Sequence, residues 1–400
     1  MTEISNKEWE IKPEKKFKGI YDKNGRLYKK KKITIIYEDE TDFFEDDISE
    51  IKLPSPKEIV NYLDKFILGQ NMAKKTLAVA IKKLEHRIKY PELEIPKSNI
   101  LISGNTGCGK TYLIKTLANF SNIPVLELKM TDFSSTGFVG DTMADRFNQL
   151  INYEDYNFEE VKSMITNNDF DLIPFVKNAE YAIIYLDEID KIANITEQGG
   201  AGFFKQDLQN ELIGFIEDSK VLEGALSTKN MLFVGTGAFV GLEDIIKNRI
   251  NKKSSIGFQT TNLSKKNNIN SENLLSYAKP EDFIKYGFMP ELIGRFPTSS
   301  HVKTLTEQDL VKILEMPTSY LSNQIETLKQ IYEIKINFDK KAKFEISKHS
   351  KRLGTNARGL HSIIDKILEP IFYEPEKYDR GIINITKKTV NSAINDPNYF

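Results

Sequence analysis

The clearest regularity along the chain is a series of short apolar runs separated by longer helical patterns. Four runs, NILISG, VLELKM, AIIYLDEID and MLFVGTG, lie between residues 99 and 237. Each has the length of a strand and is rich in aliphatic residues, which is typical of buried parallel strands. Helices alternating with such strands predict an α/β fold, with a three-layer α/β/α domain.

Helical patterns flank this domain. On its N-terminal side, LPSPKEIVNYLDKFILGQ opens with Ser and Pro, a signal that predicts a helix start. After LTEQDLVKIL the pattern becomes mainly helical, with one strand predicted at GIINIT. We therefore expect three parts: a divergent N-terminal segment (1–52), a large domain (53–303) and a small C-terminal domain (304–400).

The N-terminal segment has its own pattern. KGIYDKNGRLYKKKKITIIYED predicts two short strands around an Asn-Gly turn, and the acidic run EDETDFFEDD follows. The segment is either a small β module for adaptors or substrates or merely a tail.

Composition narrows the classes of partner. The chain has 56 basic and 57 acidic residues, so no global field favours nucleic acid or a membrane surface. A single cysteine excludes an internal disulfide, and the four histidines show no metal-ligand spacing. No signal peptide or membrane-spanning stretch is visible. We expect a cytoplasmic protein without zinc, and neither nucleic acid nor membrane as a partner.

A phosphate-binding loop is predicted at GNTGCGKT, which satisfies GxxxxGK[ST] between a strand and a helix. Its glycines let backbone N–H groups turn toward phosphate oxygens, and the following helix N-terminus favours an anion. Lys110 would reach the β- and γ-phosphates, and Thr111 would ligate Mg²⁺. The predicted nucleotide-binding residues of this loop are Gly104, Asn105, Thr106, Gly107, Cys108, Gly109, Lys110 and Thr111.

An acidic pair supplies the other half of the predicted centre. Asp187 and Glu188 end the apolar run AIIYLDEID. Asp187 would hold the Mg²⁺ shell, and Glu188 would polarise the attacking water. Alone, such a pair is usually a solvated turn, but after a P-loop it predicts a hydrolytic centre. Because no Asn-Lys-x-Asp motif is present, we expect ATP rather than GTP.

Together these motifs resemble those of the AAA+ ATPases, and specifically of the ClpX family of HSP100 unfoldases, over about residues 53–395. DKFILGQ resembles the segment whose Ile67 and Leu68 flank the adenine. MLFVGTGAF resembles the sensor 1 strand, with Thr236 as the polar sensor. GTNARGL resembles sensor 2, whose Arg358 would reach back to the phosphates and couple hydrolysis to the angle between the two domains.

PELIGRFP resembles the box that carries an arginine finger, at Arg295. Taken alone, this arginine is explained equally well by a salt bridge. In the family the finger points across a subunit boundary at the neighbour's γ-phosphate, where it stabilises transition-state charge. The resemblance therefore implies a homohexameric ring.

Two loops resemble family sites for other proteins. TGFVGD is similar to the axial pore loop, which grips substrate polypeptide through Gly137, Phe138, Val139 and Gly140. Without that context, a Gly-aromatic pair is usually a packed turn. Family members usually carry Tyr where this chain has Phe138, and Phe keeps the ring.

The second loop, NKKSSIGFQTTNLSKKNNIN, is polar except for Ile256, Gly257 and Phe258. From composition alone, an anchor onto its own domain is the better explanation. Its position between the sensor 1 strand and the arginine-finger box resembles that of the Ile-Gly-Phe loop with which ClpX proteins dock a ClpP-type peptidase. Several weak pegs on flexible tethers add through effective concentration.

The chain also departs from the family pattern. ClpX proteins usually begin with a four-cysteine zinc-binding domain, which one cysteine cannot form. The stretch IEDSKVLEGALSTKNMLF predicts a short hairpin that lacks the Arg-Lys-His triplet of the family's second pore loop. Recognition of the usual C-terminal degradation tag is therefore open.

The function that the resemblance implies is an ATP-driven unfoldase. It would thread unfolded or tagged protein substrates through a hexameric pore and deliver them to a ClpP-type peptidase. The alternative is a remodelling chaperone that works without a peptidase. The related HslU unfoldases would carry a large insertion after the pore loop, and a nonhydrolysing scaffold would lack at least one of Lys110, Glu188 and Arg295, all of which are present.

Overall fold

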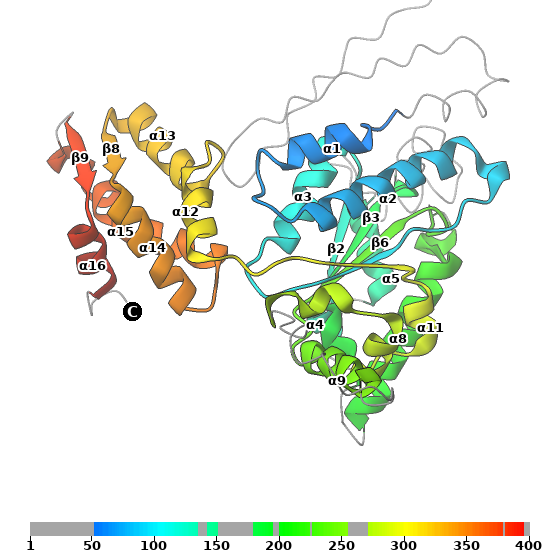
Figure 1. Ribbon diagram of the computed structural model, residues 1–400. Helices are drawn as coiled ribbons and strands as arrows, with labels where there is room; N and C mark the ends of the chain where they lie inside the picture. Colours follow the sequence, from blue (N-terminus) through cyan, green and yellow to red (C-terminus); the bar gives the residue numbers. More distant parts are fainter. Residues whose placement is uncertain are drawn as a thin grey trace, which may run out of the picture. The chain divides into compact units, whose positions relative to one another are not determined.

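The computed structural model describes residues 52–134, 142–150, 179–194, 200–224, 226–254, 271–378 and 381–395 (Figure 1). Residues 51–400 group into one structural unit. The predicted N-terminal strands, the predicted pore loop at 137–140 and the predicted docking loop at 256–258 lie outside the described residues.

The first described helix, α1 (Pro56–Leu63), begins where its start signal predicts. The Ser55 hydroxyl accepts a hydrogen bond from the backbone N–H of Glu58, and the Glu58 carboxylate accepts one from the backbone N–H of Ser55. This reciprocal capping box satisfies two N–H groups that the helix leaves open. A turn at Gly69 and Gln70, both with positive φ, then leads into α2 (Asn71–Lys89).

The large domain is built on a five-stranded parallel sheet of order β2-β3-β6-β1-β7. Its strands are β1 (Ile100–Ser103), β2 (Val125–Lys129), β3 (Ile183–Asp187), β6 (Leu232–Gly237) and β7 (Thr298–His301). The four strands predicted from apolar runs are confirmed. The strand β7 was not predicted, because it is an edge strand whose residues Thr-Ser-Ser-His are polar.

Helices cover both faces of this sheet, so the predicted three-layer arrangement is confirmed. In Figure 1, α1, α2 and α3 lie on one side of the strands and α8 lies on the other. On the α8 side, Leu101, Ile184 and Phe233 of the strands share a hydrophobic core with Leu212 and Ile216 of α8. The helices of the large domain after α2 are α3 (Lys110–Ser121), α4 (Met130–Ser134), α5 (Met143–Arg146), α8 (Gly200–Asp218), α9 (Leu242–Ser254), α10 (Pro280–Tyr286) and α11 (Pro290–Gly294).

After α8, the predicted hairpin is confirmed as a short antiparallel pair, β4 (Lys220–Val221) and β5 (Leu226–Ser227). Two side chains from elsewhere hold its end. Lys97 Nζ donates to the carbonyl of Thr228 at 3.0 Å, and Arg87 donates to that of Lys229 at 2.8 Å. The hairpin is therefore tied to the segments before β1.

The C-terminal part has a hydrophobic core of its own, from Leu305 to Val390. It contains α12 (Glu307–Glu315), α13 (Tyr320–Tyr332), α14 (Lys340–Arg352), α15 (Ala357–Tyr373) and α16 (Lys387–Asn395). The strand predicted at GIINIT is confirmed as β9 (Ile382–Ile385), which pairs in parallel with β8 (Lys335–Phe338), a strand that the sequence analysis missed. The core of the sheet domain ends at Phe296 and the second core begins at Leu305. The boundary near residue 303 stays a prediction.

Candidate active site

The predicted nucleotide residues lie at the carboxyl ends of three adjacent strands of the sheet. The P-loop comes after β1, Asp187 ends β3, and Thr236 lies near the end of β6. Because the strands are parallel, their carboxyl ends share one edge, where ligands of such sheets bind. Thr236 Oγ1 donates a hydrogen bond to Asp187 Oδ1 at 2.9 Å, so these two groups are in contact.

The P-loop is curled by glycines with positive φ, including Gly107 at 76° and Gly109 at 89°. Gly109 immediately precedes α3, and no side chain caps the first turn of that helix. The N–H groups of this turn are therefore open to an anion, and the helix dipole favours one.

Lys110 points back into the loop. Its ammonium donates to the carbonyls of Gly104 at 2.5 Å and Asn105 at 3.1 Å. An ammonium has three N–H donors, so one is left for a further acceptor such as a phosphate oxygen. Burial lowers the pKa of Lys110, and the positive charge of Arg358 contributes to this lowering. Arg358, from the C-terminal part of the chain, is thus near enough for its charge to act on the lysine of the P-loop.

A chain of hydrogen bonds links Thr111 to Asp187. Thr111 Oγ1 lies 2.9 Å from the Tyr185 hydroxyl, which lies 2.9 Å from Thr236 Oγ1. Burial and the nearby charge of Asp187 raise the pKa of Tyr185, so its hydroxyl stays protonated. Hydroxyl and carboxylate oxygens are ligands that suit Mg²⁺, and Thr111 and Asp187 offer one of each.

Glu188 follows with a left-handed backbone, at φ 56° and ψ 37°. This conformation is unfavourable for a residue with a side chain, by about 1–3 kcal/mol, and such strain gathers at functional sites. The Glu188 N–H donates to Asp187 Oδ1 at 3.0 Å, which helps to hold the turn.

The segment at the start of α15 lies directly on the P-loop. Asn356 Nδ2 donates to the carbonyl of Thr106 at 2.9 Å, and the N–H of Ala357 donates to that of Gly107 at 3.1 Å. The approach is close, since a Cβ placed on Gly107 would lie 2.0 Å from the carbonyl oxygen of Thr355. Arg358, the predicted sensor 2 residue, comes next in the chain and is exposed.

The predicted adenine segment lies beside the connection between the two cores. Gln70, which follows Ile67 and Leu68, donates to the carbonyl of Lys303 at 2.9 Å and accepts from its N–H at 2.7 Å. Thr318, just before α13, donates to the carbonyl of Lys65 at 2.8 Å. Ile67 is buried and Leu68 is half-buried.

Comparison with known proteins agrees with this geometry. The family AAA domain (Cdc48 subfamily) matches residues 95–299, which carry four strands of the sheet and the first two residues of β7. The ATP-dependent Clp protease ATP-binding subunit ClpX of Borrelia duttonii is 34% identical over 366 residues, which cover 86% of this chain and 80% of that protein. Its counterpart in Treponema denticola is 33% identical over 371 residues, covering 86% and 83%. The chain belongs to the ClpX family of AAA+ ATPases.

Membership confirms the family predicted from the motifs, together with the α/β AAA+ fold. The protein is therefore an ATPase, and the residues around the P-loop are its candidate nucleotide site. Within the described ranges, every helix is too short or too polar to cross a membrane. The roles of single residues, and of the pore and docking loops, stay predictions.

Arg295 of this ClpX-family ATPase lies away from its own P-loop. Its carbonyl accepts a hydrogen bond from Asn99, the residue before β1, at 2.9 Å, whereas the P-loop follows the other end of that strand. The four residues of β1 span about 13 Å, since each advances by about 3.3 Å. The guanidinium forms an ion pair with Glu217, and both side chains are about half exposed, at 48% and 47%.

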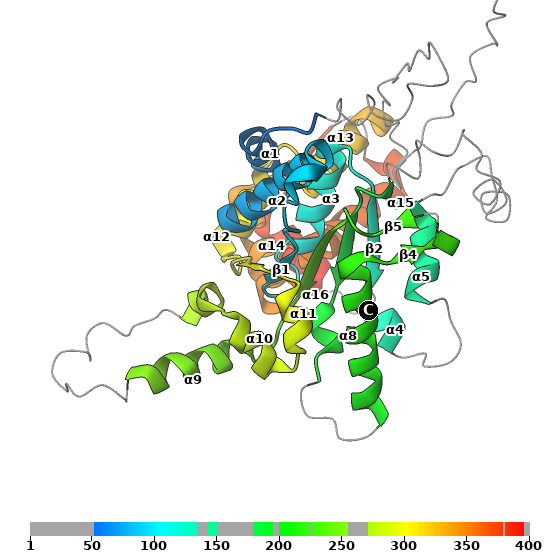
Figure 2. The same cartoon turned by 90° about the vertical axis from the view of Figure 1, so that its right-hand side faces the viewer.

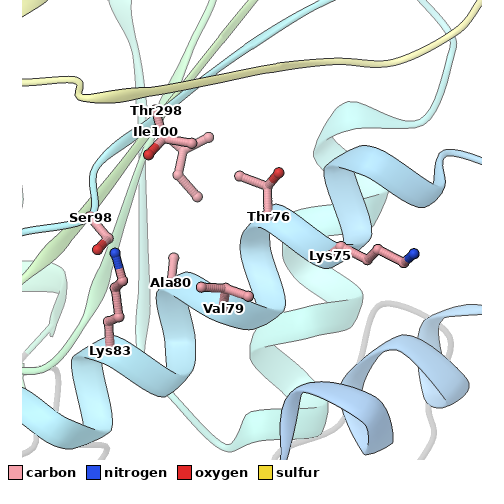
Figure 3. A pocket seen from close by; sticks show the side chains of 8 residues that line it. All are labelled: Lys75, Thr76, Val79, Ala80, Lys83, Ser98, Ile100 and Thr298. Carbon is pink, nitrogen blue, oxygen red and sulfur yellow. The ribbon is translucent and has the colours of Figure 1, made fainter.

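A hollow of about 280 Å³ lies between α2 and the sheet (Figure 3). Two of its lining residues, Ile100 and Thr298, are the first residues of β1 and β7. Because the P-loop follows the opposite end of β1, this hollow is separate from the candidate nucleotide site.

Two residues of this ClpX-family site were not predicted from the sequence. Tyr185 was counted with the apolar residues of a buried strand, although a buried tyrosine hydroxyl usually needs a partner. Asn356 lies in the recognised GTNARGL segment, but nothing local indicates that its side chain reaches the P-loop.

Proposed function

We propose that this ATPase is a protein unfoldase that works as a homohexameric ring. It threads unfolded or tagged polypeptides through the central pore and delivers them to a ClpP-type peptidase. The observation that carries the proposal is the direct contact between the P-loop and the start of α15, because it connects the candidate phosphate site to the second core.

In this proposal the residues around the P-loop divide the work. The N–H groups at the start of α3 and the ammonium of Lys110 bind the phosphates. Thr111 and Asp187 would hold Mg²⁺, which supplies positive charge beside the phosphates when bound. Glu188 accepts a proton from the attacking water. Ile67 and Leu68 flank the adenine.

Movement of the small domain follows from where the nucleotide binds. Asn356 and Ala357 bond to carbonyls of the same loop whose N–H groups would face phosphate. A change in the phosphates therefore changes the surface on which α15 rests, and Arg358 reads that change as sensor 2. Repeated changes of this kind would drive the pore loop at 137–140 along the substrate.

Arg295 acts on the neighbouring subunit in this proposal. It lies at the amino ends of the strands, and the length of β1 separates it from its own P-loop. This position favours a role in trans. The exposed ion pair with Glu217 stabilises the resting position by at most about 1 kcal/mol, so a phosphate can replace it.

The peptidase partner is supported by the names of the relatives, each an ATP-dependent Clp protease ATP-binding subunit. Ile256, Gly257 and Phe258 are the residues proposed to dock the peptidase. The alternative, a remodelling chaperone without a peptidase, shares the ATPase and the pore loop and would not use these three residues.

Degradation of an unstructured protein by this ATPase and a ClpP homologue from the same source tests the proposal. We expect ATP-dependent degradation by the unaltered chain. Deletion of residues 256–258 should abolish degradation while the ATPase rate stays within about twofold, because the loop touches neither nucleotide nor substrate in this proposal.

The outcome separates the two functions. Equal degradation with and without residues 256–258 would contradict the docking role. ATP-driven unfolding of a substrate in the absence of any degradation would favour the remodelling chaperone instead.

A further inference from the structure

Four oxygen-bearing side chains form a continuous hydrogen-bonded row in the large domain. It runs from Thr111 on α3 to Tyr185 on β3, then to Thr236 on β6 and back to Asp187 at the end of β3, with 2.9 Å at each step. Tyr185 is fully buried, with an exposed fraction of 0%. Its hydroxyl is therefore shielded from water, and it meets the two threonines and also interacts with Asp187.

The row has one direction, which the last contact determines. A carboxylate only accepts hydrogen bonds, so Thr236 donates its single proton to Asp187 Oδ1. The Tyr185 proton is then directed to Thr236 or to the neighbouring carboxylate of Asp187, and in neither case to Thr111. Tyr185 in turn accepts from Thr111. The Thr111 proton therefore points to Tyr185, and the lone pairs of Thr111 Oγ1 point elsewhere.

We propose that Tyr185 is a positioning residue that turns the Thr111 hydroxyl so that its lone pairs face the bound metal. A threonine whose proton is free would rotate and present that proton for part of the time. The neighbours that orient metal ligands in this way strongly affect metal affinity. The inference rests on the proposed role of Thr111 and Asp187 in holding Mg²⁺.

A phenylalanine at this place would fill the same volume without the hydroxyl, so Tyr185→Phe isolates the proposed effect. Thr236→Val breaks the row at its next member, and Thr236→Ser keeps the hydroxyl. Tyr286→Phe is the matched control, because it removes a hydroxyl from another buried tyrosine of the same domain.

Calorimetric binding of ATPγS, a slowly hydrolysed ATP analogue, is measured over a range of MgCl₂ concentrations and in EDTA. Tyr185→Phe and Thr236→Val should each raise the Mg²⁺ concentration for half-maximal enhancement of binding by about tenfold. Binding of the analogue in EDTA should change less than about twofold for Tyr185→Phe, because the buried tyrosine would act on the nucleotide only through the metal that Thr111 holds. The double variant should need no more Mg²⁺ than the more strongly affected single variant, since both substitutions break the same row. Thr236→Ser and Tyr286→Phe should resemble the unaltered protein.

Three results would overturn the inference in different ways. If Tyr185→Phe keeps the normal Mg²⁺ dependence while Thr111→Val loses it, Tyr185 does not position the ligand, and the proposed metal site stands. If Thr111→Val also keeps it, the proposed metal site itself is wrong. If Tyr185→Phe weakens binding equally with and without Mg²⁺, the tyrosine has only a structural role.

Discussion

At the scale of single residues, burial changes the chemistry of a lysine far from the nucleotide site. Lys97 Nζ donates to the carbonyl of Ile216 near the end of α8 and to that of Thr228 in the hairpin, at 2.5 and 3.0 Å. It also lies 5.4 Å from the centre of the Phe233 ring. Burial, with a contribution from the charge of Arg87, lowers the pKa of Lys97 to about 7.

This shift predicts a rise of stability with pH. Above its folded pKa of about 7 and below about pH 10, Lys97 is mostly neutral in the folded chain and protonated in the unfolded chain, so unfolding takes up a proton. The free energy of unfolding therefore rises with pH, by up to about 1.4 kcal/mol per pH unit. Urea denaturation at pH 7, 8 and 9 should show this slope, and Lys97→Met should remove that part of it.

The exposed Lys329 offers a matched control for this measurement. Lys329→Met should leave the pH profile of the free energy of unfolding unchanged. Parallel profiles for the unaltered chain and Lys97→Met would show that Lys97 keeps an ordinary pKa in the folded protein.

At the scale of elements, the sequence predicted the strands whose burial gives them an aliphatic pattern. The aliphatic runs of β1, β2, β3 and β6 are buried, so their pattern identifies them. β7 has no such pattern, because only Ser300 of its residues is buried and its place depends on pairing with β1. The P-loop and the acidic pair were predictable because each motif is contiguous.

Contacts between distant segments of the site were not predictable in this way. Asn356 and Thr106 are 250 positions apart, and the row through Tyr185 joins three elements. Such contacts depend on how the two cores are placed by the whole chain, which no single window of sequence contains. Motif order indicated that GTNARGL belongs to the site, but not which of its atoms touch the loop.

Substitutions of two glycines in the P-loop can distinguish the packing of α15 on the loop from backbone strain alone. Both have positive φ, but a Cβ on Gly107 would meet Thr355, whereas one on Gly109 would meet nothing within 4 Å. Gly109→Ala should lower the melting temperature of the nucleotide-free protein by about 2–4 °C, the effect of about 1 kcal/mol of strain. Gly107→Ala should lower it by at least twice as much, because α15 must also move. Equal melting temperatures in differential scanning calorimetry would contradict the close packing of α15 on the P-loop.

At the scale of the whole molecule, residues from both hydrophobic cores meet at one loop. Thr106 and Gly107 accept hydrogen bonds from the start of α15, and Asn105 donates to Thr304 in the connection between the cores at 2.8 Å. Arg295 lies near the other end of the sheet. We infer that a complete ATPase centre needs two copies of the chain, one giving the P-loop and the other the arginine finger.

The most direct test of this claim is the ATPase rate of mixed rings made by co-expressing two inactive variants. Glu188→Gln keeps its finger but cannot activate water, and Arg295→Ala keeps its own site but gives no finger. Each alone should be nearly inactive. A one-to-one mixture should recover about a quarter of the normal rate, since half of the sites are intact and half of their neighbours carry a finger.

The matched control replaces Glu188→Gln with the double variant Glu188→Gln, Arg295→Ala, which brings no finger and should restore nothing. If the first mixture recovers activity and the control does not, the site is shared between subunits as proposed. A first mixture that is no more active than the average of its two components would contradict the shared site.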